Sequence, residues 1–184
     1  MKRKASILAC LAALLLLAGG CRSRTDRTAG AVVLTFGTIT GIPAIVSVGN
    51  TVTGTGAVLI TNFNLISVVK DPTGVPGPLE DVEITSYQVT YRRRDSGTRV
   101  PPPLVQTFAL EVPVNGTGTI INLPILRLDQ LLNPPLSDLA NFGQDRETGT
   151  AVIVLDAEIT FFGHTLSGDA IASPAAGVSL EFIP

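Results

Sequence analysis

The chain has 184 residues, a formal net charge of −2, 45% hydrophobic residues and 5% aromatic residues. A mildly acidic chain lacks the clustered Lys and Arg that neutralise phosphates, which argues against nucleic-acid binding. The low charge content argues against extensive disorder, and the absence of a Gly-X-Y period or a sustained heptad excludes collagen-like and coiled-coil folds. Frequent Gly and Pro among Val, Ile and Thr favour short strands joined by tight turns.

Residues 1–20 have the three-part layout of a secretory signal peptide. Lys2, Arg3 and Lys4 form a basic start, and residues 5–20 carry no charge. This uncharged stretch is shorter than the ~20 residues that a membrane-spanning helix needs. An ordinary cleaved secretion signal is one interpretation, and an uncleaved anchor is disfavoured by the length.

The last residues of this leader, Leu17-Ala18-Gly19-Gly20-Cys21, resemble the lipobox of bacterial lipoprotein signal peptides. Ala18 departs from the commonest pattern, which has Leu there. The resemblance implies that diacylglycerol is joined to the Cys21 sulfur, that the chain is cut just before it, and that the new amino group is often acylated. Two or more acyl chains anchor a protein stably. We therefore expect a protein held on a bacterial membrane without spanning it.

Residues 22–30 are polar, and we interpret them as a flexible tether, either solvated or touching anionic headgroups through its arginines. In enterobacterial lipoproteins, an Asp directly after the lipidated Cys tends to retain the protein at the inner membrane. This chain has Arg22 there, and the absence of Asp favours the outer membrane. Without residues 1–20 the chain has ten basic and fifteen acidic residues, a net charge of −5. Cys10 leaves with the leader and Cys21 is lipidated, so we expect no disulfide and no Cys-based site.

The remaining residues, 31–184, are expected to form one domain. Short runs rich in β-forming residues, separated by turn signals, predict strands at residues 31–36, 44–48, 56–69, 82–93, 104–114, 119–123, 150–162, 165–172 and 177–183.

The alternation within the predicted strand at residues 82–93 slips by one position. Ile84 falls on one parity, whereas Tyr87 and Tyr91 fall on the other. A bulge near Ser86 would absorb this slip and direct both groups into the core.

Two connections have specific signals. Asn115-Gly116 predicts a hairpin turn. Residues 127–142 break the strand pattern, with leucines at helical spacing interrupted by Asn133-Pro134-Pro135, and predict one or two short helical turns. The spacing of the turns favours an antiparallel two-sheet sandwich of about seven to nine strands, with a small barrel as the alternative.

The stretch Ile84-Thr85-Ser86-Tyr87-Gln88-Val89-Thr90-Tyr91-Arg92 resembles the third strand of fibronectin type III modules, I-x-x-Y-x-V-x-Y-R. The resemblance implies an immunoglobulin-like sandwich. The chain departs from that family because it has no Trp, and because residues 150–162 hold no Tyr for a tyrosine corner. Such modules mostly bind partners or act as spacers, and the fold alone does not identify a function.

Little in the sequence points to catalysis. His164 is the only His and is expected in a solvent-facing turn, and Gly-x-Ser-x-Gly does not occur. One His and no free Cys cannot build a zinc site. Glu80, Asp81 and Glu83 could meet a hard cation, but the calcium loop D-x-D-x-D-G is missing, so we expect no metal and no cofactor.

Arg92-Arg93-Arg94 is the one run of charge, and it is either a contact for an acidic partner or headgroup or a solvated strand end beside Asp95. The loops 72–79 and 94–103 are rich in Pro, which lowers the entropy cost of ordering them on binding, so they are candidate contact loops.

The sequence therefore predicts a lipid-anchored, non-enzymatic structural or binding accessory of the bacterial cell envelope, facing the periplasm or the cell surface. Its expected partners are the bilayer, through Cys21, and another envelope protein. One alternative is a lipid-anchored hydrolase using clustered carboxylates, which acids of raised pKa in a pocket would favour. Another is a subunit that adds a strand to a partner sheet, which a long, uncharged, unpaired edge would favour.

Overall fold

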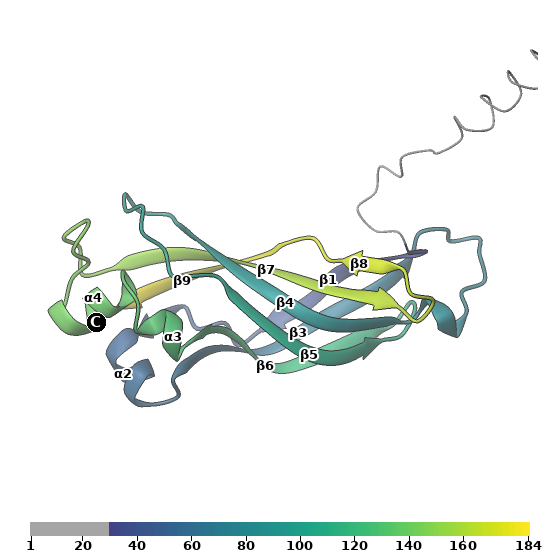
Figure 1. Cartoon of the computed structure of the whole chain (residues 1–184), viewed down its shortest axis with the longest axis horizontal. Coiled ribbons are helices and arrows are strands. Elements are labelled where there is room, and N and C mark those ends of the chain that lie inside the picture. The colour runs from purple at the N-terminus through teal and green to yellow at the C-terminus, as the bar shows by residue number, and fades with distance from the viewer. Residues whose placement is uncertain (1–29) are drawn as a thin grey trace, which may run out of the picture.

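The computed structural model describes residues 30–184, so the predictions for the signal peptide, Cys21 and residues 22–29 lie outside the described residues. The described chain is mostly β, and its strands form two layers in an elongated sandwich (Figure 1). The elements in chain order are β1 (Val32–Thr40), β2 (Ile45–Ser47), α2 (Val48–Thr53), β3 (Ala57–Val69), the 3-10 turn η1 (Pro78–Glu80), β4 (Val82–Arg93), β5 (Leu104–Val112), β6 (Thr117–Arg127), α3 (Leu128–Leu131), α4 (Leu136–Phe142), β7 (Ile153–Thr165), β8 (Ala170–Ala172) and β9 (Ala176–Ile183).

One sheet has the strand order β1-β3-β6, and the other has the order β2-β9-β7-β4-β5 with β8 paired to β7. The predicted two-sheet antiparallel arrangement is confirmed for every described strand pair except one. β2 pairs with β9 in parallel. The chain crosses from the smaller sheet to the edge of the larger one between β1 and β2, and there β2 runs in the same direction as β9.

The predicted slip in β4 is confirmed, one residue from the expected place. Its ladders with β5 and β7 both shift register between Ile84 and Ser86. Against β7 the extra residue is Thr85 of β4, whereas against β5 the extra residue lies on β5, between Thr107 and Leu110. Ile84 and Tyr87 are consequently both buried although they differ in parity. Across the ladder, a Cβ on Gly163 would collide with the carbonyl oxygen of Glu83. Gly163 is therefore a strand residue at a point where two backbones come unusually close.

The predicted hairpin at Asn115-Gly116 is wrong. β5 pairs with β4, and β6 pairs with β3, so this turn carries the chain from the larger sheet to the smaller one. Asn115 has a φ of 54°. Its Oδ1 accepts a hydrogen bond from the Val69 N–H at 3.2 Å, and the Gly116 carbonyl accepts one from the Ser67 N–H at 3.1 Å. The polar groups of the turn thus bond to β3, and the two strands that flank the turn lie in different sheets.

Aromatic rings join the two sheets. The ring centroids of Phe63 on β3 and Phe161 on β7 lie 5.1 Å apart, and Tyr87 lies 5.8 Å from Phe161. The Tyr87 hydroxyl donates to the Pro124 carbonyl at 2.8 Å. These contacts confirm the prediction that the tyrosines of β4 pack in the core.

Tyr91 lies four residues further along β4, on the same face as Tyr87, and makes a similar hydrogen bond across the sandwich. Its hydroxyl donates to the Ile125 carbonyl of β6 at 2.6 Å. Burial raises the pKa of Tyr91 well above its usual range and that of Tyr87 to about 12, so both phenols stay protonated and can donate. Five alternate residues of β7, namely Ile153, Leu155, Ala157, Ile159 and Phe161, are buried and form its core face.

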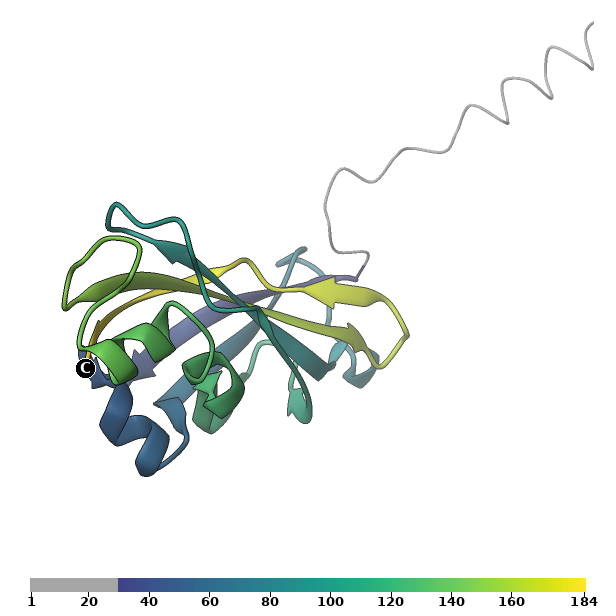
Figure 2. The same ribbon diagram turned by 60° about the vertical axis from the view of Figure 1, so that its left-hand side comes forward.

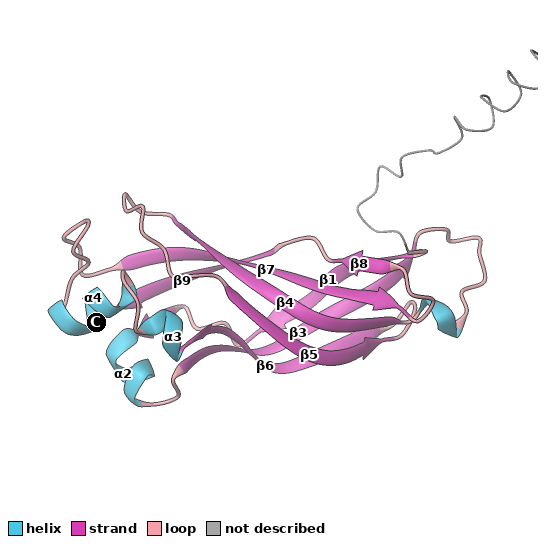
Figure 3. Cartoon of the chain, viewed as in Figure 1, coloured by secondary structure: helices cyan, strands magenta, loops and turns pink. Residues whose placement is uncertain are grey.

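Three short helices gather at one end of the sandwich (Figures 2 and 3). α3 and α4 confirm the helical connection predicted at residues 127–142. α2 is a correction, since residues 44–48 were expected to form a strand ending in a Gly49-Asn50 turn. The strand stops at Ser47 because its hydroxyl accepts a 3.4 Å hydrogen bond from the Asn50 N–H and caps α2.

We call this the helical end; it comprises α2, α3, α4, the loop 94–103 and the C-terminus. The opposite end, which we call the entry end, holds Gly30 and the connections at residues 70–81, 113–116 and 166–169 (Figure 1).

Candidate functional site

The helical end contains an open groove of about 630 Å³ between the segment after β1, the β2–α2 unit and the start of β3. Its volume falls within the range of small-molecule sites. Thirteen residues line it, and none of them carries a charge: Gly41, Ile42, Pro43, Ile45, Val46, Ser47, Asn50, Thr51, Gly54, Thr55, Ala57, Val58 and Leu59.

Local hydrogen bonds fix the walls of this groove. The Ser47 hydroxyl donates to the carbonyl of the C-terminal Pro184 at 2.8 Å, and the Thr51 hydroxyl donates to the Ser47 carbonyl at 2.7 Å. Gly41 has a φ of +70°, and a Cβ there would collide with the side chain of Thr61. With its walls ordered, its side chains mostly apolar and no titratable group in its lining, the groove is suited to a neutral apolar ligand.

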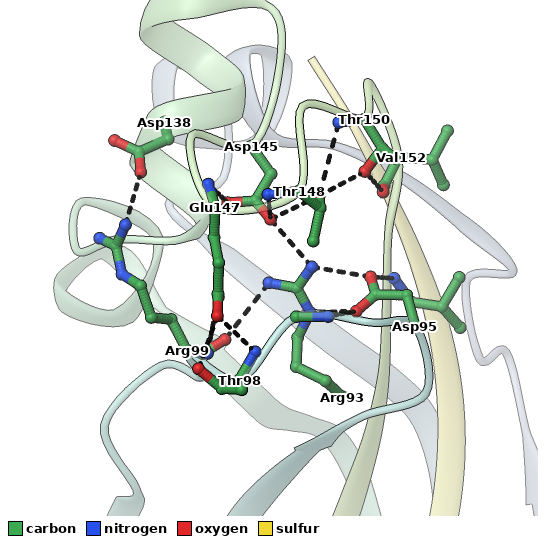
Figure 4. Close-up of polar contacts among 12 residues, drawn as sticks. Arg93, Asp95, Thr98, Arg99, Asp138, Asp145, Glu147, Thr148, Thr150 and Val152 are labelled. Atoms are coloured by element: carbon green, nitrogen blue, oxygen red, sulfur yellow. Dashed lines mark hydrogen bonds and ion pairs between the residues drawn. The ribbon is translucent and has the colours of Figure 1, made fainter.

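A separate cluster of charged residues, centred on Arg93, lies at the same end of the sandwich (Figure 4). The side chain of Arg93 is only 2% exposed. Its guanidinium donates to both carboxylate oxygens of Asp95, at 2.6 and 2.8 Å, and to Oδ2 of Asp145 at 3.0 Å. Arg93 is therefore not available to a partner, which corrects one third of the predicted contact run.

The two carboxylates that accept from Arg93, those of Asp95 and Asp145, are held ionised. Burial by itself would raise the pKa of Asp95, but hydrogen bonds from Arg93 and the Gly97 N–H more than offset it and lower that pKa. For Asp145, burial is likewise outweighed by hydrogen bonds from Thr148, the Glu147 N–H and Arg93. A general acid needs a raised pKa to be protonated at neutral pH, so these shifts run opposite to what the hydrolase alternative requires.

The cluster fastens two loops to each other. The Glu147 carboxylate accepts hydrogen bonds from the Thr98 N–H at 2.9 Å and the Arg99 N–H at 3.0 Å. The Arg99 guanidinium in turn lies 3.3 Å from Asp138 on α4. The candidate contact loop 94–103 is thus bonded to the segment after α4, and the other candidate loop, 72–79, lies at the opposite end of the molecule.

The two other arginines of the predicted run remain on the surface. Arg92 and Arg94 approach the same carboxylate, that of Asp156, at 3.3 and 3.7 Å, and both side chains are largely exposed. Surface pairs of this kind contribute little to stability, so these two residues keep the properties of a candidate contact.

The remaining predicted groups are dispersed. Asp81 accepts the Val114 N–H at 2.7 Å, and Glu83 lies 3.4 Å from His164 Nε2 with both side chains exposed. His164 sits on β7 and not in a turn, because the strand continues to Thr165. Within residues 30–184 no three His, Cys, Asp or Glu side chains come together in a way that could hold a metal ion.

Sheet edges matter for the strand-addition alternative. β1, the edge strand on one side of the smaller sheet, has nine residues and no charge, as that alternative requires. β6, on the other side, is an edge strand whose only charged residue is Arg127. Its outer rim is interrupted by Pro124, which has no N–H to donate, and by Asn122 at a φ of 56°. The Pro124 carbonyl is also taken by the Tyr87 hydroxyl. These features oppose pairing with an incoming strand along this edge.

Sequence reasoning missed the burial of Arg93 and the groove. The burial of Arg93 could have been predicted from the alternation along β4, because Arg93 has the same inward parity as Tyr87, Val89 and Tyr91. The groove had none, because its walls come from segments whose separation depends on how β2 crosses to the larger sheet.

Among the described residues no helix has the length and apolar character to cross a membrane. No family model and no curated protein matches the chain. One solved structure, the solution structure of a candidate late embryogenesis abundant (LEA) protein, is similar over 97% of this chain and 86% of that chain, with 13% sequence identity and a TM-score of 0.36. At these values the similarity gives no information on function.

Proposed function

We propose that the protein is a lipid-anchored, non-enzymatic binding accessory of the bacterial cell envelope, joined to the outer membrane through Cys21. In this proposal the groove at the helical end takes a neutral apolar ligand or side chain. The observation that carries the proposal is the placement of two features: the described chain starts at one end of the sandwich, and the uncharged groove opens at the other (Figure 1).

The distance between these ends suits an anchored module. A tether attached near Gly30 leaves the helical end directed away from the lipid, so the groove stays accessible while the anchor is in place. The lowered pKa values of Asp95 and Asp145 support a binding role over the hydrolase alternative, because both groups serve to hold loops and neither is poised to give up a proton.

An immunoglobulin-like class is the finer part of this proposal. The sheets β1-β3-β6 and β5-β4-β7-β9 separate the strands in the manner of such sandwiches, in which the first and second strands lie in one sheet and the third and the last two lie in the other. β4, which carries the fibronectin-like stretch, is a central strand of the larger sheet. β2 and β8 are additions to that plan.

The anchor is tested in cells that make the full chain. Mass spectrometry should find Cys21 modified by fatty acyl groups, and the protein should appear in the membrane fraction. The Cys21→Ser variant should move to the soluble fraction, since the thioether cannot form. An unmodified Cys21, or membrane association that Cys21→Ser leaves unchanged, would refute the anchor.

The groove is tested with the neutral apolar dye Nile red. Ile45→Asp places a charge in the groove lining, and we expect it to weaken dye binding by about tenfold or more because the carboxylate must be desolvated. Ile121→Asp is the matched control, as Ile121 is similarly exposed but lies on β6 outside the groove. Equal dye binding by the two variants would refute the groove as the binding surface.

A further inference from the structure

Three apolar side chains stand out at the entry end. Val75 is 97% exposed, Leu79 64% and Leu166 46%. They belong to two connections that are bonded together: the Leu166 N–H donates to the Asp81 carbonyl, and the Ser167 N–H donates to the Leu79 carbonyl, each at 2.9 Å. The tip of the sandwich is therefore one joined surface with apolar groups at its rim.

The loop that carries Val75 is ordered and uncharged. Asp71 Oδ1 accepts hydrogen bonds from the Thr73 N–H at 2.9 Å and the Thr73 hydroxyl at 2.7 Å, and the Gly74 N–H donates to the Asp71 carbonyl at 3.2 Å. Residues 72–79 include three prolines and no charged residue. A stiff loop loses little conformational entropy when its tip is buried in another phase.

The described chain begins beside this loop. The Lys70 N–H donates to the Ala31 carbonyl at 2.8 Å. Ala31 and Val75 also line one small hollow of about 180 Å³. Figure 1 shows the first residues of β1 next to the 70–81 connection. The point where the chain enters the domain and the apolar rim are thus on the same end of the molecule.

The occupant of this surface follows from the chain that precedes it. Nine residues, 22–30, separate Cys21 from Ala31, and the ten residue steps between these two positions span at most about 35 Å even when fully extended. We propose that the entry end docks on the bilayer that carries the Cys21 acyl chains, with Val75, Leu79 and Leu166 entering its interfacial layer. This inference rests on the proposed lipid anchor.

The charges near this surface set a condition on the lipid. Asp71, Glu80, Asp81 and Asp169 lie on the connections that carry the apolar rim, and Lys70 is the one basic residue in the sequence of these connections. Anionic headgroups would repel this net negative end, so apolar burial and not charge attraction drives the docking. Zwitterionic phosphatidylcholine is accordingly the preferred surface, and phosphatidylglycerol-rich vesicles should be contacted less.

The experiment uses the full chain, made and processed in bacteria and reconstituted into phosphatidylcholine vesicles. The mature chain has Cys21 as its sole cysteine, so in the lipidated protein a cysteine introduced elsewhere is the single free thiol. Val75→Cys and Leu79→Cys carry an environment-sensitive fluorophore. Ile121→Cys, midway along the sandwich, and Leu132→Cys, at the helical end, are matched exposed controls.

We expect the labels at 75 and 79 to shift their emission to the blue and to be quenched by lipids that carry a quencher on the acyl chain. The labels at 121 and 132 should report water. The shift at 75 and 79 should decrease in phosphatidylglycerol-rich vesicles.

The outcomes separate the inference from the anchor on which it rests. An acylated, vesicle-bound protein with water-exposed labels at 75 and 79 overturns the docking and leaves the anchor intact. A protein in which Cys21 itself reacts with the dye and stays in solution overturns both, because no bilayer is then held at the entry end. A shift of equal size at all four positions overturns the docking as well, since the signal would not be specific to that end.

Discussion

The two ends of the sandwich are held together in different ways. At the helical end, charged side chains connect the loops: Arg93 bridges Asp95 and Asp145, and Glu147 accepts two backbone N–H groups. At the entry end, mostly backbone groups connect the loops: the Leu166 N–H donates to the Asp81 carbonyl and the Ser167 N–H to the Leu79 carbonyl, each at 2.9 Å, and the Asp81 carboxylate adds one bond from the Val114 N–H at 2.7 Å.

This difference has a physical consequence. A buried ion cluster is sensitive to pH and to the loss of one partner, whereas backbone bonds have no charge to lose. The entry end can therefore leave its side chains, such as Val75 and Leu79, free for another surface, and the helical end uses its side chains internally.

The largest expected loss of stability comes from disrupting the ion cluster at the helical end. Asp145→Ala removes one partner of the buried Arg93 guanidinium and should lower the free energy of unfolding by about 3–5 kcal/mol, measured by urea denaturation. Leu79→Ser, at the exposed entry end, is the control and should change it by at most about 0.5 kcal/mol. Losses of similar size in the two variants would contradict the contrast between the ends.

A smaller effect tests the close backbone approach of β4 and β7 near the entry end. Gly163→Ala places a Cβ against the Glu83 carbonyl and should cost about 1–3 kcal/mol of unfolding free energy, because the strands must separate locally. Gly177→Ala on β9 is the matched control, since a Cβ there meets nothing within 4 Å. Its effect should be within about 0.5 kcal/mol, and a cost equal to that of Gly163→Ala would refute the packing argument.

The smallest effect is the pH dependence of the ion cluster. Asp95 and Asp145 have lowered pKa values in the folded state, so their contribution to stability is full above their ordinary value of 3.8 and is lost as the pH falls through the lower folded values. Unfolding free energy should thus decline below about pH 4, and the decline should be shallower in Asp145→Asn. The unfolding free energy of both proteins is measured by chemical denaturation at each pH. An identical decline below about pH 4 in the two proteins would show that other groups control the acid dependence.

Much of the fold was predictable from local patterns. The run of β-forming residues at 150–162 identified most of β7, the slip in β4 identified its bulge, and the leucine spacing at residues 127–142 identified the helical connection, because each signal lies within one element. The hairpin at Asn115-Gly116 was mispredicted because the same turn residues serve a two-strand hairpin and a crossing between sheets, and only the pairing of β6 with β3 distinguishes the two.

By itself the sequence determined the alternation that makes two half-buried sheets, and it holds the run Leu17–Cys21 on which the proposed anchor rests. The tertiary structure alone decided that Arg93 is buried against Asp145, 52 residues away along the chain, that an uncharged groove opens at the helical end, and that the apolar tip of the 72–79 loop lies where the chain enters the domain. The physical reason is range: the period of side chains along a strand is local, whereas ion pairs, grooves and the placement of loops depend on which distant strands become neighbours.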